Sequence, residues 1–335
     1  MNESTMKSCQ TNRIEYIDIA KGILIILVVV GHVTNAAHYL TYGIKAVITT
    51  FHMPAFFVIT GLLTDLEKIQ CVSIKTFLLK KASRLLVPYV FFEITGGLWQ
   101  MLLMGTDAVN LIGIFSGILT IHCHVGADWF LPTIFFAEIG VYLLIRMCNK
   151  KIYPLISAAC LVGAFILSDI TYLVACCRRI LVAIAFILTG LSFKTIFKKK
   201  NLFALIAAII VTIATAYFNG VVDLATRRFG NHILYIIGSL AGTYSILCVS
   251  QYLTGILARI LSRIGKSSLV IMGTHQNVQV AFNVFFGSTY SLPLQLVVFV
   301  TILLYEVVTV VVYERYIPFL VGAKYKYTKQ KILKG

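Results

Sequence analysis

Two ionisable residues, Lys21 and His32, stand eleven positions apart in the first apolar segment of the chain. All residues between them are Gly, Ile, Leu or Val, so we expect a helix in lipid, where charged groups are costly. Eleven residues make about three helical turns, which puts both side chains on one face, roughly 16 Å apart along the axis. Asp18 precedes Lys21 by one turn, a spacing that favours an ion pair. One helix face thus offers an anion-binding group and a proton-transfer group.

Two histidines are candidate catalytic residues. His32 suits a general base because imidazole titrates near neutral pH, and Gly31 beside it leaves room for an approaching group. A histidine that only bonds a neighbouring helix is the alternative. His52 lies beside Pro54, and this proline is expected to break a helix next to a cavity. For His52, the alternative is capping of a helix start at the membrane surface.

Several cations are candidates for binding the phosphates of a cofactor. Arg84 follows Lys80 and Lys81 at the start of the third apolar segment, where a basic cluster either binds phosphates or only orients the protein. Arg178 and Arg179 lie some six residues inside the sixth segment. Two adjacent arginines cannot share one helix face, so at least one must meet a cavity, a headgroup or a carboxylate; extension to the outer surface is the alternative. Candidate carboxylate partners are Glu93, Glu138 and Glu306.

Polar residues on the expected outer side are candidates for substrate binding. Two histidines, an aspartate and a tryptophan lie within eight residues and suit a platform for a sugar: His122, His124, Asp128 and Trp129. An aromatic belt at the start of a span is the alternative. Asp223 lies in another outer loop. His275 lies inside the ninth segment, where an interhelical hydrogen bond is the alternative to a role in binding.

Composition predicts an all-α, polytopic integral membrane protein with about ten transmembrane helices. Hydrophobic residues make up 59% of the 335 residues and the mean hydropathy is +0.89, more than one soluble core could bury. Residues 109–121 are apolar but short, which predicts a half-helix at the interface. The ten expected spans are approximately 14–33, 47–63, 85–104, 129–147, 153–168, 172–193, 202–218, 232–253, 267–286 and 292–314.

The distribution of Lys and Arg predicts that both termini are cytoplasmic. With the N-terminus inside, 23 of the 29 Lys and Arg residues fall on the cytoplasmic side, in agreement with the positive-inside rule. We therefore expect a cytoplasmic segment 1–13, a single transmembrane domain 14–316 and a basic cytoplasmic tail 317–335. No cleavable signal is recognisable. The eight cysteines have no metal-ligand spacing, so no metal site is expected.

In their order along the chain, these motifs resemble the acyltransferase 3 family of integral membrane proteins, especially its fucose 4-O-acetylase-like members. The matching residues are Asp18 to Lys21 with His32, Phe51 to Gly61, Arg84 to Tyr89, Trp129 to Glu138, Asp223 with Phe229 and Gly230, and Gly273 to His275. The resemblance implies transfer of an acyl group, usually acetyl, from cytosolic acetyl-CoA to a hydroxyl of a cell-envelope glycan or lipid-linked saccharide in the bacterial inner membrane. It also implies that Lys21 helps to bind CoA and that His32 is the base.

Two chemical routes and one different class of function are compatible with these motifs. In direct transfer, His32 deprotonates the acceptor hydroxyl while His52 or Arg178 stabilises the oxyanion; an acyl-histidine relay is the variant. The pantetheine arm of CoA would reach along the face from Lys21 to His32. A transporter or sensor is the alternative function, although no internal repeat is visible. Expected partners are membrane lipids and the glycan acceptor, with no nucleic acid; an extracytoplasmic protein partner is an open question.

Overall fold

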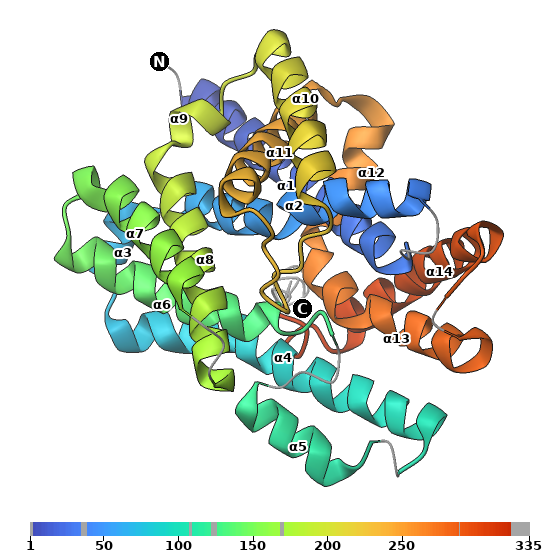
Figure 1. Cartoon of the computed structure of the whole chain (residues 1–335). Coiled ribbons are helices and arrows are strands. Elements are labelled where there is room, and N and C mark those ends of the chain that lie inside the picture. Colours follow the sequence, from blue (N-terminus) through green and yellow to red (C-terminus); the bar gives the residue numbers. More distant parts are fainter. Residues whose placement is uncertain are drawn as a thin grey trace, which may run out of the picture.

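The computed structural model describes residues 3–34, 39–106, 109–121, 126–167, 171–287 and 289–322, with side chains from residue 15 onward. Within these ranges the chain is helical, and extended backbone pairing is limited to one isolated bridge between Asp223 and Arg228. The protein is an all-α, polytopic membrane protein, as its composition predicts (Figure 1).

Each of the ten apolar segments forms a helix. They are α1 (Glu3–Val33), α2 (Tyr39–Leu63), α4 (Ile74–Met104), α6 (Phe130–Met147), α7 (Tyr153–Ile166), α8 (Tyr172–Ser192), α10 (Leu202–Asn219), α11 (His232–Tyr252), α13 (Ser268–Phe286) and α14 (Leu292–Tyr316). In the described part of the chain, eight helices are long and apolar enough to cross a membrane. The other two of the ten are α7, with 14 residues, and α13, whose 19 residues include several polar side chains.

Five shorter elements connect the long helices. They are α3 (Leu66–Cys71), α5 (Leu111–Thr120), the 3-10 turn η1 (Lys150–Ile152), α9 (Lys194–Phe197) and α12 (Gly255–Lys266). The short helix predicted within 109–121 is α5, which lies beside α4 at the edge of the molecule (Figure 1). Its first turn is capped by the Asn110 side chain, which accepts a hydrogen bond from the Gly113 amide at 2.8 Å, the usual use of Asn before a helix.

Pro54 does not break α2, contrary to the sequence-based expectation. The helix runs without interruption from Tyr39 to Leu63, with Pro54 inside it. His52 therefore lies in the middle of a helix, and the alternative that it caps a helix start is also wrong. A proline can be accommodated in a transmembrane helix where neighbouring helices surround the freed backbone groups.

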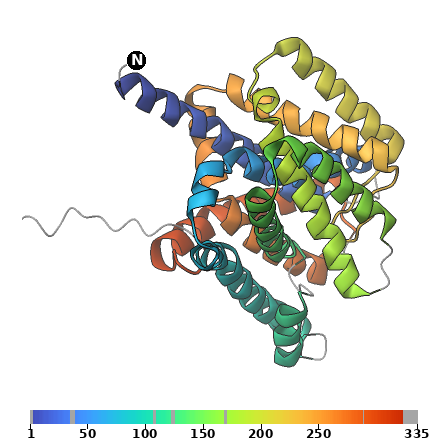
Figure 2. The same cartoon turned by 90° about the vertical axis from the view of Figure 1, so that its left-hand side faces the viewer.

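The long helices alternate in direction, so the connecting loops gather at two ends of the bundle. Figure 2 shows the start of α1 and the end of α14 on the same side. We call this side the amino-terminal end. There, Lys194 donates to the Thr64 carbonyl and Arg146 donates to the Gln70 carbonyl. At the opposite end, the Val222 amide donates to the Thr49 hydroxyl at 3.2 Å.

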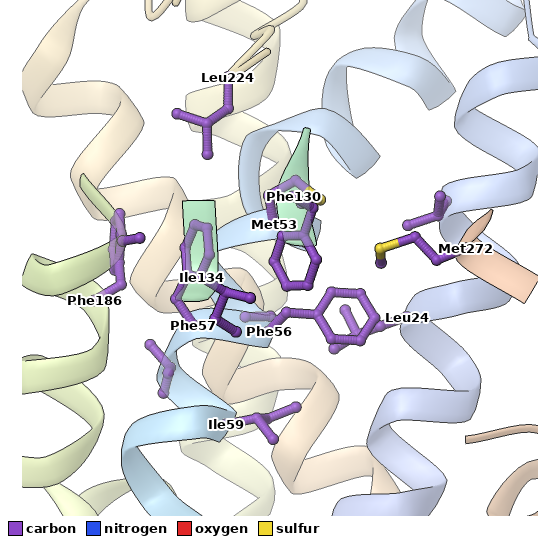
Figure 3. Close-up of a cluster of buried hydrophobic side chains, with 14 of the residues drawn as sticks. Leu24, Met53, Phe56, Phe57, Ile59, Phe130, Ile134, Phe186, Leu224 and Met272 are labelled. Atoms are coloured by element: carbon purple, nitrogen blue, oxygen red, sulfur yellow. The ribbon is translucent and has the colours of Figure 1, made fainter. Parts of the chain in front are cut away.

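The core lies between α1, α2, α6, α8 and α13. Figure 3 shows Leu24 of α1, Phe56 and Phe57 of α2, and Phe186 of α8 directed toward one another. Leu224, from the loop between α10 and α11, reaches into the same cluster (Figure 3). Packing among these side chains holds α1 and α2 in fixed positions, and these two helices contribute both predicted catalytic histidines.

Candidate active site

Three histidines from three helices come close together toward the opposite end of the bundle. The ring centroids of His32 (α1) and His275 (α13) are 5.1 Å apart, with 52° between the ring planes. His52 (α2) and Lys45 lie close enough for their charges to act on His32. We call His32, His52 and His275 the histidine cluster. The structure thus brings together the two predicted catalytic residues and one predicted substrate-binding residue.

Backbone hydrogen bonds fix the rings of two members of the cluster. The Nδ1 atom of His275 lies 2.8 Å from the Ile271 carbonyl oxygen, and Nδ1 of His52 lies 2.9 Å from the Ile48 carbonyl oxygen. A carbonyl oxygen only accepts, so each Nδ1 carries a hydrogen and each neutral ring keeps its lone pair on Nε2. Neutral His52 therefore cannot supply the hydrogen bond to an oxyanion that the sequence suggested for it.

His275 is the most enclosed member of the cluster. Its exposed fraction is 0%, and its Nε2 atom is buried without a hydrogen-bond partner among the residues that the structure describes. Buried polar atoms in proteins are nearly always hydrogen-bonded, so such an atom marks a place for a ligand, a water molecule or a reacting group. In the described residues neither ring nitrogen of His275 makes an interhelical hydrogen bond, and the role of His275 in binding stays a prediction.

Gln276, which was not among the residues predicted from the sequence, connects the cluster to the loop before α6. The amide oxygen of Gln276 accepts from the Ala127 amide at 3.1 Å, and its amide nitrogen lies 3.1 Å from Nδ1 of His32. Gln279, also of α13, donates to the His32 backbone carbonyl at 2.7 Å. The available signal was the presence of two glutamines close to His275 in an otherwise apolar segment, since polar groups at membrane depth need partners.

The predicted cofactor-binding residues do not form one group. Lys21 forms the expected ion pair with Asp18, at 2.6 Å, and its side chain is 21% exposed. Arg84, at the start of the transmembrane part of α4, is exposed. Both lie toward the amino-terminal end, whereas Arg178 and Arg179 lie in the half of α8 at the opposite end. An anionic cofactor that enters from the amino-terminal end therefore meets only the first two.

Arg178 and Arg179 are surrounded by aromatic rings. They are only 9% and 4% exposed, so the alternative that they extend to the membrane surface is wrong. The guanidinium of Arg178 lies 5.8 Å from the Phe229 ring centroid, and that of Arg179 lies 5.6 Å from the Trp129 ring centroid. Contacts of this kind stabilise a guanidinium away from water. Among the candidate carboxylate partners, Glu138 pairs instead with Lys81.

Asp128 and Trp129 are buried rather than displayed on an open platform. Trp129 is 8% exposed and Asp128 is fully buried, with neither carboxylate oxygen hydrogen-bonded among the described residues. Burial, with the charge of nearby Glu93 adding to it, raises the pKa of Asp128 well above its ordinary value. His122 and His124 lie outside the described residues. The binding of substrate by these four residues stays a prediction.

Asp223 is held at the opposite end by a tight loop. Its backbone exchanges hydrogen bonds of 2.9 and 2.8 Å with Arg228, and its carboxylate accepts from the Thr226 amide at 3.2 Å. Its charge also acts on His52 and Lys45. The loop thus places an acidic group next to the histidine cluster, although Asp223 is far from His52 in the sequence.

The arrangement is suited to proton transfer. In the described ranges, no group of three or more His, Cys, Asp or Glu side chains has the geometry of a metal site. Imidazoles with fixed tautomers can accept a proton or donate a hydrogen bond to a developing negative charge. The cluster could therefore assist the attack of a hydroxyl on a carbonyl carbon.

Comparison with known proteins agrees with this chemistry. The model of one protein family, the acyltransferase 3 family, described as an acyltransferase domain, matches residues 14–313. No curated protein and no solved structure matches the chain. The match includes all three members of the histidine cluster, Lys21 and both buried arginines. This chain is therefore a multi-pass membrane protein that belongs to the acyltransferase 3 family.

Proposed function

We propose that this acyltransferase moves an acetyl group from cytosolic acetyl-CoA to a hydroxyl of a cell-envelope glycan or lipid-linked saccharide in the bacterial inner membrane. The single observation that supports it most is the histidine cluster, which places three imidazoles at membrane depth in a member of an acyltransferase family. O-acyl transfer needs a base for the hydroxyl and a donor for the oxyanion, and this cluster offers both kinds of atom.

The proposed donor side is the amino-terminal end, where Lys21 and Arg84 lie. Most Lys and Arg residues fall on this side of the sequence-predicted topology, and CoA carries several negative charges. Between Lys21 and His32, the same face of α1 is formed by Ile25 and Val28, which are 0% and 3% exposed. In this proposal the side chains that cover these two residues move aside, so that the pantetheine arm passes along this face and brings the thioester to the histidine cluster.

The proposed acceptor side is the opposite end, next to the loops that contain Trp129 and Asp223. In this proposal Trp129 contributes an apolar ring for a sugar face, and the carboxyl groups of Asp128 and Asp223 accept hydrogen bonds from sugar hydroxyls. His122 and His124 complete the acceptor site, and Arg178 and Arg179 hold its aromatic wall. The acceptor thus enters from the end that is nearer to His32 than to Lys21.

Direct transfer is the proposed route. The cluster offers an imidazole nitrogen that can accept the proton of the hydroxyl, and a second imidazole ring lies close to it. The variant through an acyl-histidine is separable by rapid-quench experiments without acceptor, since only that route accumulates labelled protein. A stoichiometric burst of hydroxylamine-sensitive label on the protein would replace direct transfer with the relay.

The test of the function is incorporation of labelled acetyl into envelope glycans by cells that produce the wild type or His32→Gln at equal membrane abundance. We expect incorporation to fall roughly 100-fold or more, the usual effect of removing a group that transfers a proton or stabilises the oxyanion. The matched control is His232→Gln: His232 is an exposed histidine that stacks on Phe165, with ring centroids 4.1 Å apart, outside the cluster. Normal incorporation by His32→Gln would refute the proposed function of this site.

A further inference from the structure

We infer that His275 takes the proton of the acceptor hydroxyl, while Gln276 holds His32 as a hydrogen-bond donor to the oxyanion. This assignment rests on the proposed function and refines it, because the sequence alone suggested His32 as the base. It follows from three hydrogen bonds that determine which ring nitrogen carries a hydrogen.

The orientation of the Gln276 amide is determined by the backbone of the loop before α6. The Ala127 amide can only donate, so the atom of Gln276 that faces it at 3.1 Å must be the carbonyl oxygen. The NH₂ group of Gln276 therefore points to His32. The reverse orientation would place two donors against each other at Ala127 and leave both without an acceptor.

The orientation of Gln276 in turn determines the tautomer of His32. An NH₂ group needs an acceptor, and a neutral imidazole has one unprotonated nitrogen. Nδ1 of His32 is the nearer ring nitrogen, at 3.1 Å from the Gln276 amide nitrogen, against 3.4 Å for Nε2. The shorter contact favours Nδ1 as the acceptor, which leaves the hydrogen on Nε2. In this state His32 cannot remove a proton through Nε2, but it can donate a hydrogen bond there.

His275 has the opposite arrangement. Its Nδ1 donates to the Ile271 carbonyl at 2.8 Å, so the lone pair lies on Nε2, which is buried and has no hydrogen-bond partner in the described part of the chain. The His275 and His32 ring centroids are 5.1 Å apart. A ring with a basic nitrogen therefore lies next to a ring with an N–H donor, and the two charged parts of an acyl-transfer transition state require these two kinds of group.

His52 has the same backbone hydrogen bond but a different environment. Its ring is half-buried, and the charge of Asp223 acts on it. His275, by contrast, is fully enclosed and contacts His32 directly. For this reason we assign the proton transfer to His275 and use His52 as a comparison in the experiments below.

The chemical step balances without any further reactant. The acceptor oxygen forms a bond to the thioester carbonyl carbon while its proton moves to Nε2 of His275, and the carbonyl oxygen, now negative, accepts the hydrogen bond from Nε2 of His32. The carbon–sulfur bond then breaks, the carbonyl re-forms, and the proton passes from His275 to the leaving thiolate of CoA. The products are the ester and free CoA thiol, and both histidines regain their starting states.

Solid-state NMR of the full chain in lipid bilayers, labelled with ¹⁵N-histidine, tests the tautomers without any need for activity. Signals of His32, His52 and His275 are assigned by their loss in the corresponding Gln variants. We expect a hydrogen on Nε2 of His32 and on Nδ1 of His275. A hydrogen on Nδ1 of His32 or on Nε2 of His275 would overturn the assignment, even if the protein is an acetyltransferase.

The substitution Gln276→Glu tests the role of Gln276 as a positioning residue. A carboxylate can accept from Ala127 with one oxygen and from His32 with the other, so we expect the hydrogen of His32 to move to Nδ1 and glycan acetylation to fall roughly 100-fold. Gln276→Met, which has a similar length but no polar atoms, is the control and should leave His32 as a mixture of tautomers. An unchanged tautomer in Gln276→Glu would contradict the proposal.

Hydroxylamine is a nucleophile that needs no base, so it distinguishes the role of His275 as base from the role of His32 as donor to the oxyanion. Purified protein in nanodiscs is assayed with acetyl-CoA and either its glycan acceptor fraction or hydroxylamine, with the uncatalysed reaction subtracted. We expect His275→Gln to lose transfer to the glycan but to keep transfer to hydroxylamine. His32→Gln should lose both reactions. His52→Gln should retain more glycan transfer than His275→Gln. Normal glycan transfer by His275→Gln would overturn the role of His275; no transfer by the wild type would refute the proposed function instead.

Discussion

At the residue scale, the polar side chains of α13 are bonded across helices. The Thr274 hydroxyl donates to the carboxylate of Glu306 in α14 at 2.8 Å, and Gln276 joins α1 to the loop before α6. Such bonds satisfy groups that would otherwise be costly in lipid. They also account for polar residues in α13, because Thr274 and Gln276 have hydrogen-bond partners inside the bundle.

Replacing Asp128 by Asn should stabilise the protein at neutral and alkaline pH. Burial and the charge of Glu93 raise the pKa of Asp128, so the folded protein keeps this group neutral at pH values where the unfolded chain ionises it. The wild type therefore loses stability as pH rises from the ordinary carboxyl pKa toward the raised one. An Asn side chain is neutral throughout. We expect the Tm of Asp128→Asn to exceed that of the wild type at pH 8, with the difference shrinking toward pH 4.

Asp65→Asn is a control for this experiment, because its effect on stability at pH 8 should have the opposite sign. Asp65 is exposed at the start of α3, and its hydrogen bond with Lys68 lowers the pKa of its carboxyl group. This favourable contact is present above the ordinary pKa and is lost as pH falls, so any cost of Asp65→Asn appears at pH 8 and vanishes in acid. A lower Tm of Asp128→Asn than of the wild type at pH 8 would contradict the role of burial at Asp128.

At the element scale, glycines set the closest helix contacts. A Cβ added to Gly190 of α8 would lie 2.2 Å from the Val58 carbonyl oxygen of α2, and one added to Gly61 would lie 2.0 Å from the Ile187 carbonyl oxygen. Small residues allow the backbones of two transmembrane helices to touch. This contact fixes α2, and with it His52, against α8. Packing of α2 against α8 therefore determines where His52 lies in the candidate site.

Gly190→Ala should separate α2 from α8 and destabilise the fold. The added methyl group has backbone rather than a flexible side chain as its neighbour, so the helices must shift, at a cost of about 1–3 kcal/mol. Gly43→Ala is the matched control, because nothing lies within 4 Å of a Cβ at Gly43 of α2; alanine there should be neutral or stabilise by about 0.5–1 kcal/mol. Thermal unfolding followed by fluorescence-detected size exclusion measures both. Equal Tm values for Gly190→Ala and wild type would rule out the close contact.

Also at this scale, α12 is a helix that the expected spans did not include. Residues 254–266 fall between the expected spans 232–253 and 267–286, whereas residues Gly255–Lys266 form a helix packed along α1. The signal was present: Leu261 and Gly265 are four residues apart and face α1, where a Cβ on Gly265 would lie 1.8 Å from the Asp18 carbonyl oxygen. The basic residues fall between the apolar ones, as in a helix at a membrane interface. A count of charges does not show this amphipathic spacing.

At the scale of the whole molecule, the two ends of the bundle differ in chemistry. The amino-terminal end contains the Lys21–Asp18 and Lys81–Glu138 ion pairs, and the opposite end contains the histidine cluster and the Asp223 loop. In the sequence-predicted topology the first end is cytoplasmic. The proposed transfer then crosses most of the membrane inside a single chain, from a donor side to an acceptor side.

Cys71 offers a direct measurement of this orientation. It is an exposed free cysteine of α3 at the amino-terminal end. In a background in which the other seven cysteines are replaced by serine, a membrane-impermeant maleimide should therefore label it in inside-out vesicles and not in intact spheroplasts. A cysteine placed at Arg228, exposed at the opposite end, should show the reverse. Labelling of Cys71 in intact spheroplasts would invert the topology and, with it, the donor and acceptor sides of the proposal.

The sequence by itself determined the membrane character, the ten apolar helices, the short α5, the Asp18–Lys21 ion pair and the family, because these depend on hydropathy, periodicity and local spacing. Only the tertiary structure decided which polar residues meet. His275 and His32 are more than 240 residues apart in the chain, and their contact depends on how α1 and α13 pack. The role of Gln276 also depends on the backbone of Ala127, so no local pattern could assign the tautomer of His32. Hydrogen bonds between distant helices are a property of packing, and the chemistry of the candidate site depends on them.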